Sequence, residues 1–204
     1  MMAEMKFIGG CICLDFVNTV GGRVTGRDIV LRDKLKDYPD LATWSRLAGL
    51  STAREVRCLE RAAESHPARA AATLARALRL REALFRISKS LLGRSAPDES
   101  DVDVLRSELS IAKAHERLLR TKTGFAWAWD QSDHALDAPL WRVSQSAADL
   151  LTSADLGKLR QCGGDECGWM FLDTSRNRTR RWCDMKDCGN RAKVRRFRRR
   201  EGHR

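Results

Sequence analysis

Four cysteines near the C-terminal end are the residues best placed to do chemistry. Cys162 and Cys167 form one pair, Cys183 and Cys188 form a second, and four residues lie between the members of each pair. Two short loops of this kind can bring four thiolates to one tetrahedral Zn²⁺. We predict one zinc ion, structural rather than catalytic, because four thiolates leave no coordination position open for water.

The second cysteine pair leads directly into a dense basic run. Residues 160–204 carry 14 Lys and Arg against 6 Asp and Glu, which is eight of the net charge of +11. A field of this density attracts phosphate backbones, and we expect the attraction to weaken with salt. The candidate nucleic-acid contacts are Arg176, Arg178, Arg180 and Arg181 between the pairs, and Arg191, Lys193, Arg195, Arg196, Arg198, Arg199 and Arg200 after them.

The arginine-rich end predicts a helix from about residue 192 to 200. Arg191, Arg195 and Arg198 recur at spacings of four and three, so they share one side that could enter a major groove. The arginines between the pairs would hold flanking phosphates. Two alternatives stay open: a merely solvated basic tail, and an Arg191 that bonds back to the adjacent cysteine loop.

The segment between the pairs predicts a hairpin. Trp169 and Phe171 alternate as in a strand, turn formers follow, and residues 180–182 can return as a second strand. In the helix that follows, we expect Val194 and Phe197 to lie on the inner face. Residues 160–204 are thus predicted to form a small treble-clef-like C-terminal zinc finger.

Residues 1–159 predict a separate domain that is mainly α with a few short β-strands. Helices are expected from Pro39 to Gly49, from a capping box at Thr52 to about residue 65, over residues 68–92, from Asp98 or Ser100 to about residue 119, and from residue 137 through 151. The arginines of residues 68–92 are expected to form a solvated helix face.

Residues 156–160 can form a strand that leads to Cys162, and two further stretches of this domain also predict strands. Alternation in residues 5–20 indicates a buried strand after a Gly9-Gly10 turn, with Cys11 and Cys13 on one face. These cysteines could be a redox or metal pair, but we favour small core residues. Residues 123–129 alternate aromatic and alanine side chains, which could stack on bases; we favour packing in the core.

Bulk features narrow the class of protein. No apolar run approaches the roughly 20 residues of a membrane span, so we expect no membrane partner. An odd count of seven cysteines and the absence of a secretory signal favour a reducing cytoplasm. No P-loop, HExxH, GxSxG or dinucleotide motif is present, so we predict that the protein is not an enzyme.

Two motifs carry a resemblance to known families. The run Trp182-Cys183-x4-Cys188-Gly189-Asn190-Arg191, preceded by residues 171–178 (FLDTSRNR), resembles the CGNR zinc finger. Residues 14–19 (LDFVNT) are similar to the opening motif of the ABATE domain, which usually precedes that finger. The resemblance implies a bacterial-type protein of a family proposed to regulate transcription under stress, with the four cysteines as zinc ligands and the basic finger as the DNA-binding part.

We therefore predict a zinc-dependent, DNA-binding transcriptional regulator that acts in the cytoplasm at the nucleoid. Double-stranded DNA is the expected partner, and the first 159 residues would sense a small-molecule effector or form a homodimer. The alternative is an RNA-binding or ribosome-associated zinc-finger protein, because arginine-rich treble-clef fingers also serve RNA.

Overall fold

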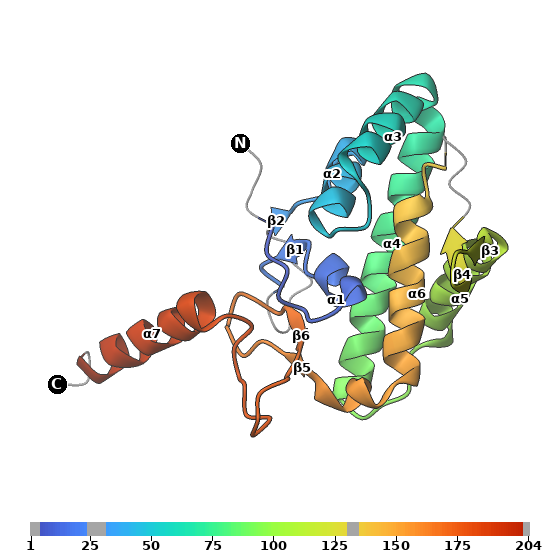
Figure 1. The fold of residues 1–204 in the computed structure, drawn as a ribbon. Coiled ribbons are helices and arrows are strands. Elements are labelled where there is room, and N and C mark those ends of the chain that lie inside the picture. Colours follow the sequence, from blue (N-terminus) through green and yellow to red (C-terminus); the bar gives the residue numbers. More distant parts are fainter. Residues whose placement is uncertain (1–4, 24–31, 130–134, 202–204) are drawn as a thin grey trace.

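The computed structural model describes residues 5–23, 32–129 and 135–201, and it is mainly helical (Figure 1). In chain order the elements are α1 (Ile12–Val17), β1 (Val20–Gly21), β2 (Arg32–Asp33), α2 (Tyr38–Leu47), α3 (Ala53–Ser65), α4 (Pro67–Leu92), α5 (Glu99–Ala114), β3 (Glu116–Thr121), β4 (Gly124–Trp129), α6 (Ala138–Thr152), η1 (Ala154–Lys158), β5 (Leu159–Gln161), β6 (Met170–Leu172), η2 (Met185–Gly189) and α7 (Asn190–Glu201). The predicted class, a mainly α part with short strands and a small C-terminal finger, is confirmed. Three glycines, Gly21, Gly22 and Gly26, predict a loop from the sequence, and Gly26 lies outside the described residues.

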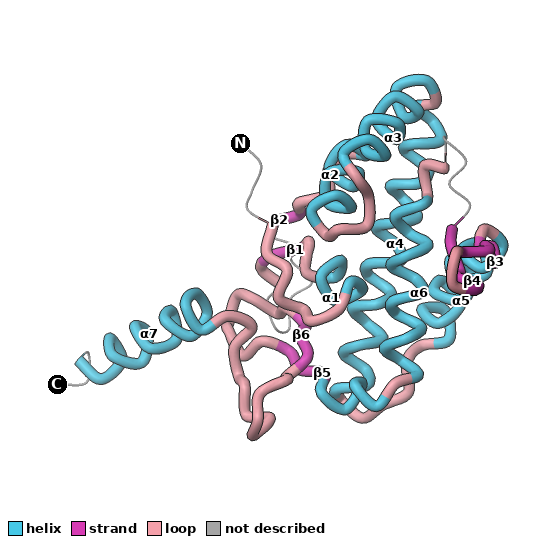
Figure 2. The backbone as a smooth tube through the Cα atoms, viewed as in Figure 1, coloured by secondary structure: helices cyan, strands magenta, loops and turns pink. Residues whose placement is uncertain are grey.

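The body is built around the long helix α4, which lies beside α5, and α5 in turn lies beside α6 (Figure 2). This 26-residue helix buries Ala77, Leu80, Leu84 and Ile87, whose spacing of three and four residues in the sequence predicts one apolar face. The short helix α1 packs on α4 and α6, and α2 and α3 cover the other end of α4. One main core therefore joins the described helices of the body, and it extends to Leu159, Met170 and Leu172.

Local signals place α2 and α3 where the sequence predicted them. Asp37 caps α2 through the Asp40 N–H at 2.9 Å, and the chain leaves the helix through Gly49 at φ +73°, a conformation that favours glycine. Thr52 and Glu55 form the predicted capping box of α3.

The predicted strand in residues 5–20 is wrong, because Ile12–Val17 form a helix. Asp15 accepts the Gly9 N–H at 2.7 Å, which folds the Gly9-Gly10 turn back over the first turn of α1. Five of the six residues of this helix are buried, so the outward-facing positions that create a helical period are missing and the alternation misleads. Cys11 is half-buried and Cys13 buried, with their sulfurs 3.5 Å apart.

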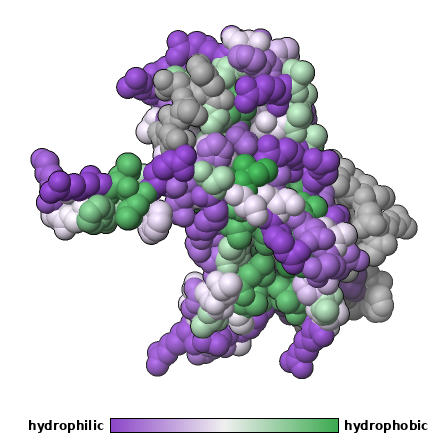
Figure 3. Space-filling model, turned by 90° about the vertical axis from the view of Figure 1, so that its right-hand side faces the viewer, coloured by the Kyte–Doolittle hydropathy of each residue, from purple (hydrophilic) through white to green (hydrophobic). Residues whose placement is uncertain are grey.

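The helix that starts after Asp98 ends at Ala114, earlier than predicted, because residues 116–121 pair antiparallel with β4. The predicted strand near residues 123–129 is confirmed, but its core position is wrong. Phe125 and Trp127 are 70% and 66% exposed, since the hairpin extends past the body and only its base, Trp129, reaches Trp141. Figure 3 shows the side of the molecule that lies to the right in Figure 1, and hydrophobic residues, in green, are visible on its surface.

The arginines of α4 are not a uniformly solvated face. Arg79 is exposed, but Arg81 is 3% exposed and holds the Asp33 carboxylate with two bonds of 2.6 and 2.7 Å, while also donating to the Thr19 hydroxyl at 3.2 Å. Burial alone would raise the pKa of Asp33, but the bonds from Arg81 outweigh it and hold this pKa below its ordinary value. These bonds connect β2 and the segment that follows α1 to α4.

A helix that crosses a bilayer needs about 20 mostly apolar residues. Among the described residues, no helix is long and apolar enough to cross a membrane.

We expect Arg81→Met to lower the free energy of unfolding by about 3 kcal/mol, because it leaves Asp33 and Thr19 without their buried donor. Urea unfolding followed by helical ellipticity, with zinc in excess, measures the change. Arg79→Met is the matched control on the exposed side of α4 and should change stability by less than about 0.5 kcal/mol. Equal effects of the two substitutions would contradict this role of Arg81.

Candidate metal centre and nucleic-acid interface

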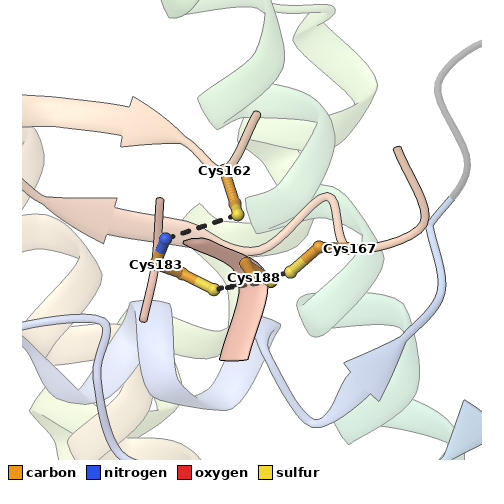
Figure 4. Close-up of side chains that lie close together, drawn as sticks. All are labelled: Cys162, Cys167, Cys183 and Cys188. Carbon is orange, nitrogen blue, oxygen red and sulfur yellow. Dashed lines mark hydrogen bonds between the residues drawn. The ribbon is translucent and has the colours of Figure 1, made fainter. Parts of the chain in front are cut away.

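The four predicted zinc ligands converge in one buried cluster (Figure 4). One ligand atom from each of Cys162, Cys167, Cys183 and Cys188 lies within 4.8 Å of the others. Cys183 Sγ is 3.5 Å from the Cys167 sulfur and 3.6 Å from the Cys188 sulfur. Zn–S bonds of about 2.3 Å in a tetrahedron require sulfurs about 3.8 Å apart, so the spacing fits zinc.

The first cysteine pair is positioned by a two-stranded sheet. Cys162 follows β5 directly, and its N–H donates to the Trp169 carbonyl at 2.8 Å just before β6. Between the two cysteines, a Cβ on Gly164 would lie 3.2 Å from the Cys167 Cβ and 3.5 and 3.6 Å from two of the sulfurs. The absence of a side chain there lets the loop close around the cluster.

The second cysteine pair lies directly before the basic helix. Asp184 accepts the Lys186 N–H at 2.8 Å through its side chain, and its carbonyl accepts the Gly189 N–H at 3.0 Å. These bonds close the turn η2, which holds Cys188 just before α7. The predicted return strand at residues 180–182 is wrong, because β6 pairs with β5 on the N-terminal side of the cluster.

The negative charge of the four cysteine sulfurs favours a cation at the centre of the cluster. Hydrogen bonds from Cys167 and Cys183 lower the pKa of the Cys162 thiol, and the contact with Cys162 raises the pKa of the Cys183 thiol. The four sulfurs therefore cannot all be thiolates without a positive charge between them. A divalent zinc ion supplies that charge and releases protons on binding, which gives one closed structural zinc site.

Arg191 bonds back to the cysteine loop, the alternative that the sequence left open. Its Nη2 donates to Cys188 Sγ at 3.3 Å and its Nε lies 3.1 Å from Asp187 Oδ1. Arg195 pairs with Asp165 of the first loop at 3.2 Å. Two of the predicted DNA contacts thus fix the angle at which α7 leaves the cluster.

The prediction that Val194 and Phe197 lie on the inner face of α7 is wrong. Val194 and Phe197 are 49% and 61% exposed, whereas Ala192 and Arg195 are half-buried. The bonds of Arg191 and Arg195 to the two cysteine loops hold the other side of the helix against the finger. These contacts turn Val194 and Phe197 outward.

The arginines between the cysteine pairs divide into two groups. Arg180 donates to the carbonyls of Trp182 and Cys183 and lies over the Phe171 ring at 4.6 Å, so it holds the loop together. Arg181 lies over the Trp182 ring at 5.2 Å. Arg176 and Arg178 are exposed at the tip.

A docking interface that the sequence did not predict joins the LDFVNT motif to the finger. Asn18 donates to the Met170 carbonyl at 2.8 Å and accepts the Met170 N–H at 2.9 Å, so its amide pairs with β6 as a further strand would. Trp169 Nε1 donates to the Val20 carbonyl at 2.7 Å. A signal was present in the sequence, since Asn18 is a polar residue at the end of an apolar run and needs a buried partner.

Two charged residues complete this interface. Lys6 reaches Asp184 at 3.3 Å and Asp187 at 3.4 Å, which connects the N-terminal segment to the second cysteine loop. Asp15 is 8% exposed, and burial raises its pKa to about 6 against the opposing hydrogen bonds from the backbone of Gly9 and Ile8. Neither residue was assigned to the site from the sequence.

A mainly helical body joined to a closed four-cysteine site and a basic helix defines a zinc-finger protein. The chain belongs to the ABATE family, whose model carries the description "Putative stress-induced transcription regulator" and matches residues 10–154. The CGNR zinc finger model matches residues 158–201, which confirms both resemblances in the predicted order. These are regulator and zinc-finger families rather than enzyme families. None of the curated proteins compared with the chain matches it.

Besides the main core, the finger has a small buried cluster of its own, which consists of the four cysteines and Phe171 with a few flanking side chains. We expect zinc chelation to unfold this cluster first. Structural zinc contributes roughly 10 to 16 kcal/mol of apparent binding free energy in small fingers. Amide hydrogen exchange after chelator treatment should show rapid exchange at Cys162 and Gly189 while Leu80 in α4 stays protected. Unchanged exchange at both finger amides after complete metal removal would refute a stabilising role for zinc.

We expect the stability difference between the protein and Asp15→Asn to depend on pH. A carboxyl with a folded pKa of about 6 favours folding below its unfolded pKa of about 3.9, and this contribution is lost as pH rises through 6. Relative to Asp15→Asn, the protein should lose up to about 3 kcal/mol between pH 4 and pH 7. Urea unfolding of both zinc-loaded proteins across this range provides the test, and a constant difference would show that Asp15 titrates in its ordinary range.

Proposed function

We propose that this chain is a zinc-dependent transcriptional regulator that binds double-stranded DNA through α7. One observation carries the proposal: α7 extends away from the helical body (Figure 1), and most of its exposed side chains are basic. Lys193, Arg196, Arg198 and Arg199 on this helix are exposed, and none forms an ion pair with another described residue. Cations held apart from carboxylates in this way remain available to phosphates.

The dimensions and side chains of α7 suit the major groove of B-form DNA. Twelve residues span about 18 Å, and the groove is about 12 Å wide. On the outer face, Val194 and Phe197 can contact thymine methyl groups, while Lys193 and Arg198 beside them reach phosphates or guanine edges. The major groove of A-form RNA is too deep and narrow for such a helix, which favours DNA over the RNA alternative.

The remaining basic residues support α7 in different ways. Arg176 and Arg178, exposed in the loop between the cysteine pairs, can hold flanking phosphates. Arg200 lies on α7, near its C-terminal end. Arg191 and Arg195 keep α7 fixed to the cysteine loops, and Arg180 and Arg181 pack on the finger's own aromatic rings. The metal would therefore act by holding the DNA-facing helix in position.

We further propose that residues 1–159 sense an effector or form a homodimer, and that residues 160–204 carry the DNA contact. The pairing of Asn18 with Met170 supports a rigid connection between the two parts, because it replaces a flexible linker with a buried contact. Action on DNA in the cytoplasm, at the nucleoid, follows from the same proposal.

We expect Lys193→Gln combined with Arg198→Gln to weaken the salt dependence of DNA binding. Contacts to about five phosphates give a slope of log affinity against log salt of about −4 to −5, and losing two cations should bring it closer to zero by about 2. Fluorescence anisotropy of the zinc-loaded protein with a labelled duplex, from 50 to 300 mM salt, measures the slope.

The matched control is Arg46→Gln combined with Arg79→Gln, which removes the same charge from exposed positions on α2 and α4. A slope that changes equally in both double variants would mean that α7 makes no specific contact. Stronger binding to structured RNA than to duplex DNA at equal salt would favour the RNA alternative instead.

A further inference from the structure

A second candidate site lies in the helical body, away from the zinc cluster. A cavity of about 410 Å³ opens between the start of α3, the end of β4 and the start of α6. Its volume is in the range of small-molecule sites. The wall contains Trp129, Trp141, Leu59, Cys58 and the two arginines Arg54 and Arg142.

Aromatic rings pack together along the inner wall of the cavity. Trp141 is 1% exposed, and its Nε1–H has no hydrogen-bond partner among the described residues and is itself buried, out of reach of a molecule in the open cavity. The His115 ring stacks on this indole with centroids 4.1 Å apart, and Trp129 lies 5.9 Å away at a tilt of 32°. This packing holds Trp129 in place at the cavity, where its half-buried indole offers an aromatic surface to a ligand.

The charges around the cavity favour an anion. The first turns of α3 and α6, helices of 13 and 15 residues, both contribute to its wall, so two positive helix ends meet there. Arg54 and Arg142 form no ion pair within the described ranges. The lining carboxylate, Glu55, already accepts the Thr52 N–H at 2.5 Å in the capping box of α3.

We propose that this cavity binds a planar aromatic anion. The ring system would pack against Trp129 beside Trp141, and the anionic group would pair with Arg142 and Arg54. The aromatic and the basic groups on the wall then each have a complementary feature on the ligand. This site does not depend on the proposed DNA contact, because α7 contributes nothing to the cavity.

Two fluorescent probes with one carbon skeleton test the proposal on the full-length, zinc-loaded protein. 8-Anilinonaphthalene-1-sulfonate carries an anionic group, and N-phenyl-1-naphthylamine lacks it. Calorimetric and fluorescence titrations should give one sulfonate probe per chain, bound at least tenfold more tightly than the neutral probe. Equal affinities, or several weak sites, would overturn the proposal.

Substitutions then locate the site. Arg142→Gln should weaken the sulfonate probe about tenfold and leave the neutral probe unchanged, whereas Arg79→Gln on α4 should affect neither. Ala138→Phe should abolish binding of both by filling the cavity, and Cys58→Phe fills it from α3 if the first variant fails to fold. Thermal unfolding and zinc content check that each variant is intact.

The exposed hairpin is the competing position for an apolar probe. Phe125→Thr combined with Trp127→Thr removes its two most exposed aromatic rings and leaves the cavity wall intact. Unchanged sulfonate binding in this variant supports the cavity. Loss of binding in it, with full binding in Ala138→Phe, would place the probe on the hairpin and refute the proposal.

Discussion

The repulsion among four thiolates, relieved by one cation, is the interaction on which the C-terminal part of this protein depends. The surrounding cluster contains Phe171 and a few flanking side chains besides the cysteines, too little apolar surface to fold about 40 residues alone. A closed coordination shell also has a directional consequence. Cys188 lies in η2, directly before α7, so the metal holds the start of that helix, and the bonds of Arg191 and Arg195 to the cysteine loops determine which side of it faces the finger.

The finger is joined to the helical body by backbone-like pairing rather than by apolar contact alone. Asn18 satisfies both polar groups of Met170, and the Leu172 N–H donates to the Gly9 carbonyl at 2.8 Å. Met170 and Leu172 are also part of the main core, so β6 belongs to both cores at once. A change in the packing of α1 between α4 and α6 therefore has a short physical route to the cysteine cluster.

Basic residues in the helical body form ion pairs that connect its elements, whereas Lys193, Arg196, Arg198 and Arg199 on α7 form none with the other described residues. Arg76 pairs with Glu108 and Asp137, and Arg81 pairs with Asp33, so these cations connect α4 to its neighbours. In the finger, Asp165 pairs with Arg195, and Asp187 pairs with Arg191 and Lys6. This division explains how a protein of net charge +11 can have a structured basic body and a helix on which several basic residues form no ion pair with the other described residues.

The sequence by itself determined the local features. Cysteine spacing predicted the metal cluster, the Thr52 capping box and the period of residues 68–92 predicted their helices, and two motifs predicted the families, because each depends on residues close along the chain. Only the tertiary structure decided that residues 12–17 form a helix, that Phe125 and Trp127 are exposed, and that Val194 and Phe197 face outward. Burial on all sides conceals helical period, and a hairpin or helix that projects from the body has no core to face. The pairing of Asn18 with Met170 and the cavity at Trp141 join segments distant in the chain, so no local pattern encodes them.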